Sequence, residues 1–523
     1  MLLSNGEKEK MAESRTDNAI KNAAASLCLR VVSILSQFFL RTVFLRVLGN
    51  EYAGVGGLFT DILNVLSLVE LGLDTSMVYA LFRPLAENDD GRVRSLLRFY
   101  RRAFRFAGTG VLAAGLLCAP FLRFLVGDLP AVQEDLRLVF LLYTVNAAVP
   151  YLFAERTVLL KAEQRGRIVS ACGIAAQCVE CAVSVWYLLT FRRFIGWLFL
   201  HLAVNFLRCG ALWFVAGRRD ARLFGEKAEP LSRGDKKRLA ADLLCMTAYH
   251  VSGVAVYSTD SIFISRFLGA AQVAVTGNYS MIVNSVRTCA EQAAGAVKPS
   301  VGHLAATSSP EKQFRIFRQM HFASFYAACS GSACLYALLD AFVGDLWLDA
   351  SYLLPPATVA LIVANFYIAV MVFPVEAFRS ANGLFRNGWG RPLVTAFLNL
   401  LLDAVLGRYY GLNGIFAATA VSRLLTQVWF DPYLIFRRVF DRTVARYLGD
   451  YLGKAMLTFV LCAATSFACS LMPIPNVLLN FICRAAVSAA LPQLALFLLY
   501  RKHEDYREIL SVFRRILKRA AKK

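Results

Sequence analysis

The sequence lacks long connections on one side of its apolar segments. The connections on one side of those segments are only about 5 to 15 residues long, and no acidic catalytic cluster accompanies them. An enzyme with this many apolar segments, such as a membrane glycosyltransferase or a polysaccharide polymerase, would need a substantial catalytic loop outside the membrane or an acidic catalytic cluster. The sequence therefore does not favour an enzyme, and we expect the protein not to be one.

The sequence also lacks a pattern of metal ligands. Its 13 cysteines are scattered, mostly within apolar segments, and the one close pair is Cys178 with Cys181. No His or further Cys accompanies this pair, so we interpret it as two small packing residues rather than a metal or redox site. We expect neither a metal site nor a cofactor.

A cleavable signal peptide is missing from the polar start, MLLSNGEKEK, so the first apolar segment is expected to stay in the protein as an anchor. The net charge of +21 at pH 7 would suit a nucleic-acid partner. Most of these cations, however, flank apolar segments, where attraction to anionic lipid and membrane topology already account for them. We expect no nucleic-acid binding.

Long apolar runs dominate what is present. Hydrophobic residues make up 57% of the chain, the mean hydropathy is +0.51, and stretches of about 20 apolar residues recur from end to end. These features predict an all-α polytopic membrane protein with about fourteen transmembrane helices. The predicted spans are 22–46, 55–81, 103–126, 136–158, 168–190, 194–216, 241–267, 272–298, 320–343, 354–378, 388–408, 412–435, 449–471 and 476–500.

The distribution of positive charge predicts the orientation. Lys and Arg accumulate on the cytoplasmic side of membrane proteins. The N-terminal segment and every second connection are rich in them, whereas the intervening connections are short and poor in cations, with Arg192 and Arg193 as the exception. Both termini are therefore predicted to be cytoplasmic.

An internal repeat predicts the architecture. Residues 48–64 read LGNEYAGVGGLFTDILN and residues 268–284 read LGAAQVAVTGNYSMIVN, in a constant register of 220 residues. The shift covers six predicted helices, so the two copies have the same orientation, as in transporters whose halves are related by an axis along the membrane normal. Chance similarity between apolar segments is the alternative. A real repeat predicts a substrate path between the halves.

The predicted organisation follows from the spans and the repeat. It comprises a cytoplasmic N-terminal segment (1–21), a six-helix N-lobe (22–218), a cytoplasmic linker (219–240), a six-helix C-lobe (241–438), two further helices (449–500) and a cytoplasmic tail (501–523). From 504 onward the tail is basic and amphipathic. It is expected to lie on the inner leaflet, or to pack as a solvated helix on the cytoplasmic loops.

The first apolar stretch, 22–47, carries Arg30 and Arg41 on one helical face. At about 100° per residue this face spans roughly a 100° arc. A charge at bilayer depth costs at least about 2.5 to 3.5 kcal/mol, so such a face is expected to line a bundle interior or a water-filled cavity. The sequence therefore predicts a pathway for an anionic group. The other members of the face are Asn22, Ser26, Ser33 and Gln37.

The second half of the chain has a matching face. Within 272–298, five polar side chains fall inside about 60° at helical spacing: Ser280, Asn284, Arg287, Glu291 and Lys298. Two cationic faces, one in each half, are thus available to line one cavity. The predicted substrate-binding residues are Arg30, Gln37, Arg41, Asn284, Arg287 and Lys298.

Acidic residues accompany these faces. The second span places Thr60, Asn64, Ser67 and Asp74 on one arc, with Glu70 at its edge and Asp61 pointing elsewhere. For each acid the alternatives are an ion pair that neutralises an arginine, or coupling of transport to protons or sodium. The candidates for coupling or charge pairing are Glu70, Asp74, Asp260 and Glu291. Glu180, Arg208, Asp403, Arg423 and Arg484 also lie at membrane depth, on faces that the sequence does not assign.

A diphosphate would suit the cationic faces, because guanidinium groups bind phosphate oxygens bidentately and stay charged when partly desolvated. Three prolines lie within spans, namely Pro150, Pro374 and Pro432. They are interpreted as structural kinks by default, with bending during alternating access as the alternative.

A segment near the N-terminus carries a family resemblance. The stretches FLRTVFLRVLG (39–49), EYAG (51–54), GLFTDILN (57–64), LSLVELG (66–72) and YALFRPLA (79–86) resemble the N-terminal signature of bacterial polysaccharide flippases. These belong to the multidrug/oligosaccharidyl-lipid/polysaccharide exporter (MOP) superfamily. Similarity is dense over residues 20–105 and thinner, mainly in span count and spacing, over the rest.

The resemblance implies a two-lobed, fourteen-helix transporter in the bacterial cytoplasmic membrane. Such a protein moves undecaprenyl-diphosphate-linked oligosaccharide from the inner to the outer leaflet for surface polysaccharide synthesis, beside the polymerase and glycosyltransferases of its pathway. The family's cavity arginines would match Arg30, Arg41 and Arg287, and the last two helices would shelter the polyprenyl tail. The alternative is a cation-coupled multidrug exporter of the same superfamily, which usually has about twelve spans and an acidic cavity.

Overall fold

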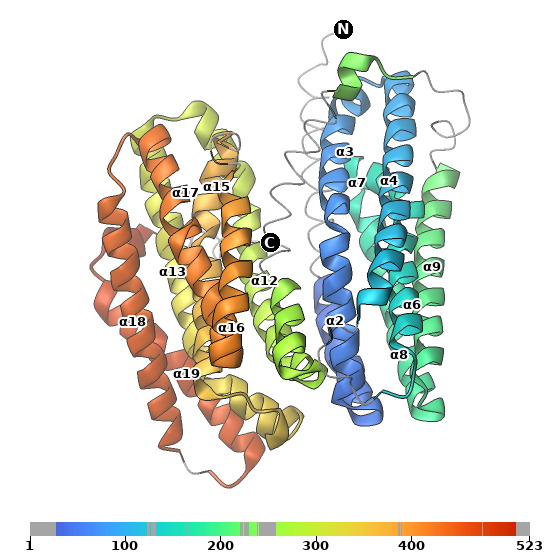
Figure 1. Cartoon of the computed structure of the whole chain (residues 1–523). Coiled ribbons are helices and arrows are strands. Elements are labelled where there is room, and N and C mark those ends of the chain that lie inside the picture. The colour runs from blue at the N-terminus through green and yellow to red at the C-terminus, as the bar shows by residue number, and fades with distance from the viewer. Residues whose placement is uncertain are drawn as a thin grey trace, which may run out of the picture. The chain divides into compact units, whose positions relative to one another are not determined.

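A computed structural model describes residues 28–122, 126, 132–163, 165–219, 223, 230–237, 239, 258–384, 388, 390–472 and 474–508. Every regular element in these residues is a helix, which confirms the all-α class (Figure 1). The chain forms two compact units, residues 1–274 and 275–523. The predicted lobe boundaries stay predictions.

The first unit is a bundle of long helices. It opens with the helix Cys28–Leu48. There follow α2 (Asn50–Leu66), α3 (Leu68–Ala86), α4 (Asp90–Cys118), α6 (Leu136–Ala148), α7 (Ala154–Ala162), α8 (Gly166–Phe191), α9 (Phe194–Arg219), a helix over 258–268 and the first turn of α12 (Ala270–Thr307).

Local sequence determines where these helices start and bend. Asp89 and Asp135 cap α4 and α6 by accepting hydrogen bonds from Arg92 N and Arg137 N, each at 2.9 Å. After α6 a short 3-10 turn contains Pro150, and the chain then bends by 48° into α7. Pro150 thus lies at a kink, as its missing N–H favours.

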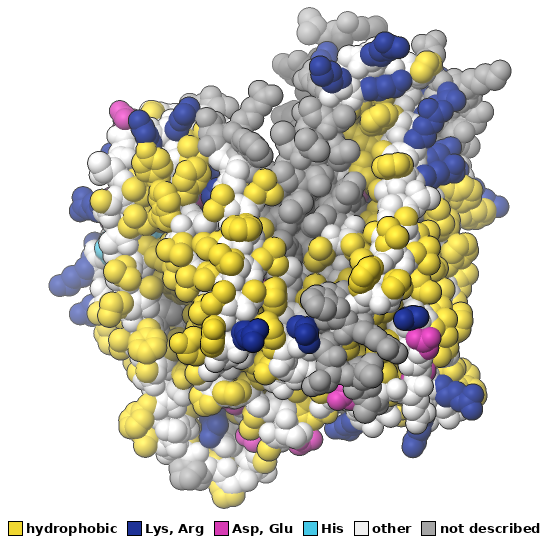
Figure 2. Space-filling view, viewed as in Figure 1, with side chains coloured by type: hydrophobic (Ala, Val, Ile, Leu, Met, Phe, Trp, Pro, Cys, Tyr) yellow, Lys and Arg dark blue, Asp and Glu magenta, His cyan; other side chains and the backbone are white. Residues whose placement is uncertain are grey.

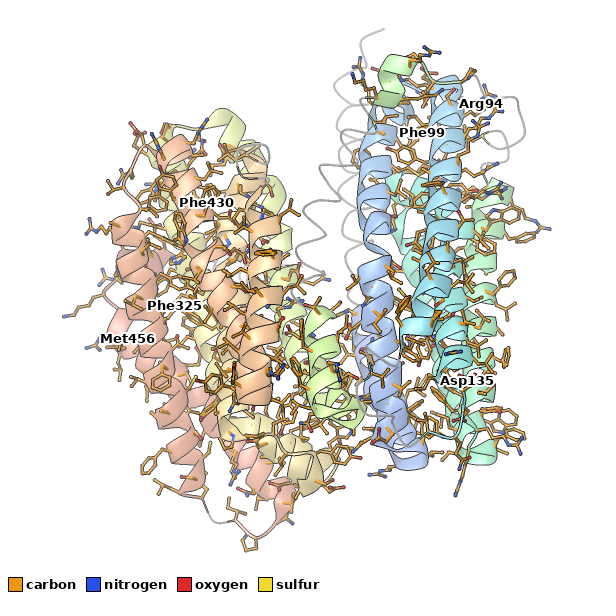
Figure 3. All side chains as sticks on the ribbon, viewed as in Figure 1. Arg94, Phe99, Asp135, Phe325, Phe430 and Met456 are labelled. Atoms are coloured by element: carbon orange, nitrogen blue, oxygen red, sulfur yellow. The ribbon has the colours of Figure 1, made fainter. Side chains whose placement is uncertain are left out.

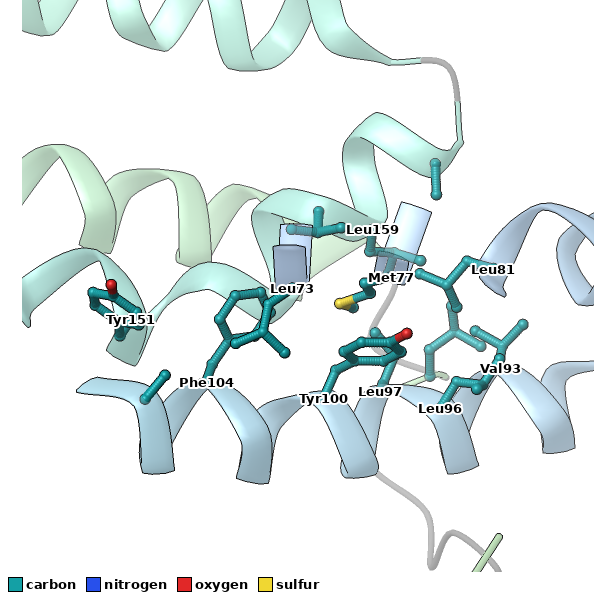
Figure 4. Close-up of a cluster of buried hydrophobic side chains, with 14 of the residues drawn as sticks. Leu73, Met77, Leu81, Val93, Leu96, Leu97, Tyr100, Phe104, Tyr151 and Leu159 are labelled. Atoms are coloured by element: carbon teal, nitrogen blue, oxygen red, sulfur yellow. The ribbon is translucent and has the colours of Figure 1, made fainter. Parts of the chain in front are cut away.

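The core of the first unit joins α3, α4 and α7. Met77 and Leu81 of α3 pack against Tyr100 and Phe104 of α4, with Leu159 of α7 completing the cluster (Figure 4). All five side chains are at most 1% exposed. Burying a large apolar side chain is worth about 1.5 to 3 kcal/mol in water, and close packing keeps the helices in one register.

The second unit contains the rest of α12 and a series of further α-helices. These are α13 (Pro310–Asp340), α14 (Pro356–Met371), α15 (Phe373–Ala381), α16 (Gly390–Leu425), α17 (Gln427–Ile435), α18 (Ala445–Ser470) and α19 (Val477–Tyr500). Pro374 lies in the first turn of α15, after a break at Val372, and Pro432 lies inside α17.

α16 is a helical hairpin rather than one rod. Gly411 has φ 55°, which divides the helix between the predicted spans 388–408 and 412–435. A Cβ on Gly414 would lie 1.9 Å from the carbonyl oxygen of Leu406, so the return arm passes the first arm at a distance that only glycine allows.

Among the residues described, nine helices are long and apolar enough to cross a membrane, or ten if the bent pair α6–α7 is one span. One of the nine, Gly390–Phe440, contains the α16 hairpin and therefore covers two predicted spans. The polytopic membrane class is confirmed, and the count of fourteen spans stays a prediction.

Side-chain exposure agrees with a lipid surround. Figure 2 shows apolar side chains over the outer faces of the helices, with Lys and Arg mainly toward their ends. Met456 of α18 is 63% exposed, whereas Phe325 of α13 is fully buried inside the same unit (Figure 3). A water-soluble protein rarely exposes contiguous apolar patches of such extent.

The 220-residue register of the repeat also appears in the backbone. Gly49 and Gly269 both have positive φ, 87° and 89°. The N–H of each donates to the carbonyl four residues earlier, Leu45 at 3.0 Å and Ser265 at 3.1 Å, and each glycine directly precedes a long helix. Positive φ at a helix end is the ordinary reason for glycine. The two halves therefore turn between their first two helices in the same way.

Candidate functional site

The first cationic face lies on the helix Cys28–Leu48 of the first unit. Arg30, Ser33 and Arg41 are partly buried, and Gln37 is exposed. Asn22 and Ser26 lie outside the described residues. A partly buried guanidinium keeps its charge and some hydration, which is the state in which it can exchange water for an anionic oxygen.

Arg41 has a defined orientation within the first unit. Its Nη2 donates a 3.1 Å hydrogen bond to the carbonyl oxygen of Ala274, in the first turn of α12. Tyr143 of α6 lies close enough to Arg41 for an electrostatic interaction. A Cβ added to Gly56 would lie only 2.7 Å from the Tyr143 hydroxyl. Glycine at position 56 thus allows Tyr143 to occupy this place beside α2.

The second cationic face lies on α12, in the second unit. Arg287 is partly buried, while Asn284 and Glu291 are exposed on the same helix. Lys298 also belongs to α12, but its side chain lies outside the described set. The convergence of the two faces on one cavity stays a prediction.

The acidic candidates have different surroundings. Asp74 accepts hydrogen bonds from the Lys161 ammonium at 3.1 Å on both carboxylate oxygens, so its partner is a lysine of α7 and not an arginine of the cationic faces. Asp260 is only 9% exposed, in the helix 258–268. Glu70 belongs to α3, and its side chain lies outside the described set.

Asp61 turns away from the polar arc of the second span, toward the helix 258–268. Its carboxylate accepts hydrogen bonds from the side chains of Ser258 and Ser261, and Asn64 Nδ2 lies 3.5 Å from its Oδ1. These three partners are neutral, so they solvate the carboxylate without cancelling its charge.

Sequence reasoning missed a polar cluster formed by side chains of α6, α8 and α9. Glu180 lies 2.6 Å from His201 Nδ1, and Asn205 Nδ2 donates to the backbone and side-chain oxygens of Asn146 at 3.0 and 2.8 Å. Arg208 in turn donates to Asn205 Oδ1 at 2.8 Å. The helical spacing of His201, Asn205 and Arg208 was the available signal, because it places all three on one face.

A second polar stripe runs through the α16 hairpin. Thr395, Asn399 and Asp403 follow one another at intervals of four, and the last two are fully buried. Asn399 donates to Thr419 Oγ1 at 3.4 Å across the hairpin, and the hydroxyls of Thr395 and Thr426 are 2.8 Å apart. This set combines a carboxylate, an amide and hydroxyls, the oxygen ligands that hard cations prefer.

Other charges in the second unit are buried as ion pairs. Asp431 of α17 is fully buried, with its two carboxylate oxygens 2.7 Å from Arg379 Nη1 and 2.9 Å from Arg391 Nη2. Within the described residues, no group of three His, Cys, Asp or Glu side chains is arranged to hold a metal ion. Cys181 is partly buried, with its thiol 3.9 Å from the carbonyl of Ser36.

The start of the C-terminal tail packs on α13. Arg318 contacts Asp505 at 2.7 Å and Glu504 at 3.3 Å, and Asp505 is 5% exposed. The apolar face predicted from Ile509 onward lies outside the described residues, so the choice between a leaflet-bound and a solvated tail helix stays open.

No protein-family model and no curated protein matches this sequence. Several solved structures share its fold. A lipid II flippase, MurJ, in an inward closed conformation is 13% identical, with a TM-score of 0.66 over 92% of this chain and 99% of that one.

Two further structures belong to transporters of the MOP superfamily. An inward-facing multidrug resistance MATE transporter is 14% identical over 77% of this chain and 96% of that one, with a TM-score of 0.53. A Pyrococcus furiosus transporter is 11% identical over 79% of this chain and 95% of that one, with a TM-score of 0.55. The reversed polarity of its binding pocket is said to suggest a different function. At these identities the likeness shows the fold alone: the chain has the fold shared by the MurJ flippase and the MATE transporters.

Proposed function

We propose that the protein is a transporter that moves an undecaprenyl-diphosphate-linked oligosaccharide from the inner to the outer leaflet of a bacterial cytoplasmic membrane. The observation that carries this proposal is the partly buried pair Arg30 and Arg41 on one face of a membrane-spanning helix. Guanidinium pairs bind phosphate oxygens bidentately, which suits a diphosphate. The fold shared with a lipid II flippase supports the same substrate class.

In this proposal the diphosphate is held by Arg30, Arg41 and Arg287 in a wet cavity, while the polyprenyl tail stays in lipid. Alternating access then exposes the cavity to each side in turn, as the two sequence repeats favour. Gln37, Asn284 and Lys298 would contribute hydrogen bonds to the same group. Partial burial matters here, because a carrier must release its cargo and a fully desolvated clamp would bind it too tightly.

A cation-coupled multidrug exporter is the second candidate, since MATE transporters share the fold. Pocket polarity separates the two candidates. An exporter of cationic drugs needs an acidic cavity, whereas the faces identified here carry Arg30, Arg41 and Arg287. For the Pyrococcus furiosus transporter of the same fold, a reversed polarity of the binding pocket is likewise said to suggest a different function.

The proposal is tested by measuring undecaprenyl-linked oligosaccharide in each leaflet of cells depleted of the protein. Accumulation in the cytoplasmic leaflet is expected, and an unchanged distribution would transfer support to the multidrug exporter. Cells complemented with Arg30→Ala or Arg287→Ala should behave like depleted cells although the variant proteins insert normally.

Arg46 provides a matched control for the Arg30 variant. It lies on the same helix, is exposed, and at about 100° per residue projects from the side opposite the cationic face. Arg46→Ala is expected to restore export. Normal surface polysaccharide in both Arg30→Ala and Arg287→Ala cells would refute the assignment of these arginines.

Energy coupling is a separate part of the proposal. The candidate acids are Glu70, Asp74, Asp260 and Glu291, of which Asp260 is the one seen buried and Asp74 the one seen in an ion pair. Asp403 is added to these candidates because a carboxylate buried in a membrane helix has a high free-energy cost, and ionisable residues kept at that cost commonly have a function. Export that is unaffected by Asn or Gln at every one of these positions would exclude coupling through them.

A further inference from the structure

The junction between α13 and α18 contains a buried cation with two partners. The ammonium of Lys454 lies 2.6 Å from Asp450 Oδ2 and 3.3 Å from His321 Nδ1. Lys454 is 7% exposed, and the rings of Phe322 and Phe325 lie 5.7 and 5.5 Å from its nitrogen. The Asp450 side chain is half exposed, so this polar contact begins at the surface of the second unit.

The contact determines where His321 carries its proton. A lysine ammonium has three donors and no acceptor, so His321 Nδ1 must accept the hydrogen bond. The neutral imidazole then carries its proton on Nε2. His321 is 3% exposed, and its Nε2 has no hydrogen-bond partner among the residues that the structure describes. A buried donor is therefore left without an acceptor among the described residues.

Another buried polar atom belongs to a side chain that packs on the same aromatic ring as His321, that of Tyr447. The hydroxyl of Tyr451 is buried, and within the described part of the chain it also has no hydrogen-bond partner. His321 and Tyr451 both pack against the ring of Tyr447, with centroid separations of 4.9 and 6.3 Å. Buried polar groups of native proteins are almost always satisfied, and where protein partners are lacking ordered water supplies the bond.

The inner end of the cluster reaches the α16 hairpin. Tyr451 lies close enough to the buried guanidinium of Arg423 to interact with it electrostatically. Arg423 stands on the return arm of the hairpin whose polar stripe includes Asn399 and Asp403. A water molecule at the cluster would thus have a donor, a hydroxyl and a nearby cation around it, and a stable buried site needs two to four polar partners.

We propose that buried water occupies the junction of α13 and α18, bonded to His321 Nε2 and the Tyr451 hydroxyl. Through Lys454 it connects the half-exposed Asp450 with the interior near Arg423. α13 and α18 therefore enclose a hydrated path into the second unit. This path is independent of which substrate the protein carries.

The test is hydroxyl-radical labelling by X-ray radiolysis of the full chain in nanodiscs, read out by mass spectrometry. Radicals form from water, so a buried side chain is modified quickly only where water lies against it. Tyr279 is the matched control, because it is fully buried in the same unit but its hydroxyl donates to Asp340 at 2.7 Å and accepts from Leu354 N at 3.3 Å. His321 and Tyr451 are expected to be modified several-fold faster than Tyr279.

Labelling of His321 and Tyr451 no faster than that of Tyr279 would overturn the proposal. The variant Tyr451→Phe removes one partner of the water and is expected to lower the labelling rate of His321 several-fold. An unchanged rate at His321 would show that no water is shared. If this variant does not fold, the wild-type comparison with Tyr279 still decides. No substrate is present, so neither result bears on the flippase proposal.

Discussion

Replacement of Asp431 by Asn is predicted to destabilise the second unit strongly. The carboxylate is fully buried and neutralises two guanidiniums that are themselves almost fully buried, Arg379 at 2.7 Å and Arg391 at 2.9 Å. Removing one member of a buried ion pair leaves uncompensated charge and typically costs about 3 to 5 kcal/mol. For a unit of this size, roughly 2 to 4 °C per kcal/mol gives a fall in Tm of about 6 to 20 °C.

The assay is thermal unfolding of the purified protein in detergent, with Glu87→Gln as the control. Glu87 pairs with Arg83 at 2.8 Å, but both side chains are largely exposed, and exposed ion pairs contribute little. The reasoning would be refuted if Asp431→Asn lowered Tm no more than Glu87→Gln. Replacing all three members by apolar side chains of similar size should recover much of the loss, because buried ion pairs are close to neutral overall.

Two further predictions concern the α16 hairpin. Gly414→Ala should lower Tm far more than Gly196→Ala. The new methyl group at position 414 would lie 1.9 Å from the backbone oxygen of Leu406, which cannot move away easily. At position 196 it would lie 1.7 Å from the hydroxyl of Tyr187, and that side chain can move. Equal shifts in a thermal-unfolding series would contradict this. Asp403→Asn keeps the size and polarity of the side chain but removes its charge, and it should reduce export. Full export in complemented cells would remove Asp403 from the coupling candidates.

The sequence was sufficient for those features that depend on local chemistry. Apolar length predicted the membrane helices, and the repeat placed glycine at 49 and 269, where the backbone has positive φ. The predicted gap between spans 388–408 and 412–435 coincides with Gly411 in the α16 hairpin. Each of these follows from one residue or one run of residues, without knowledge of neighbouring helices.

Pairings between helices could not be predicted in the same way. Glu180 pairs with His201, which lies 21 residues further along the chain on another helix. Asp431 pairs with Arg379, which lies 52 residues earlier, also on another helix. A period of 3.6 residues assigns a side chain to a face, but it does not say which helix that face meets. The sequence consequently identified Asp403 and Arg423 as charges at membrane depth and left their faces open.

The charges of this protein differ in burial, and that difference bears on function. Asp431 and its two arginines are almost completely removed from solvent and paired at close distance, so they can hold helices together but cannot exchange partners. Arg30 and Arg287 are only partly buried, on the first and second cationic faces. A binding group for a carried anion must be desolvated enough to attract it and hydrated enough to release it. The partly buried arginines are therefore the better candidates for substrate contact, and the almost fully buried triad is better suited to holding helices together.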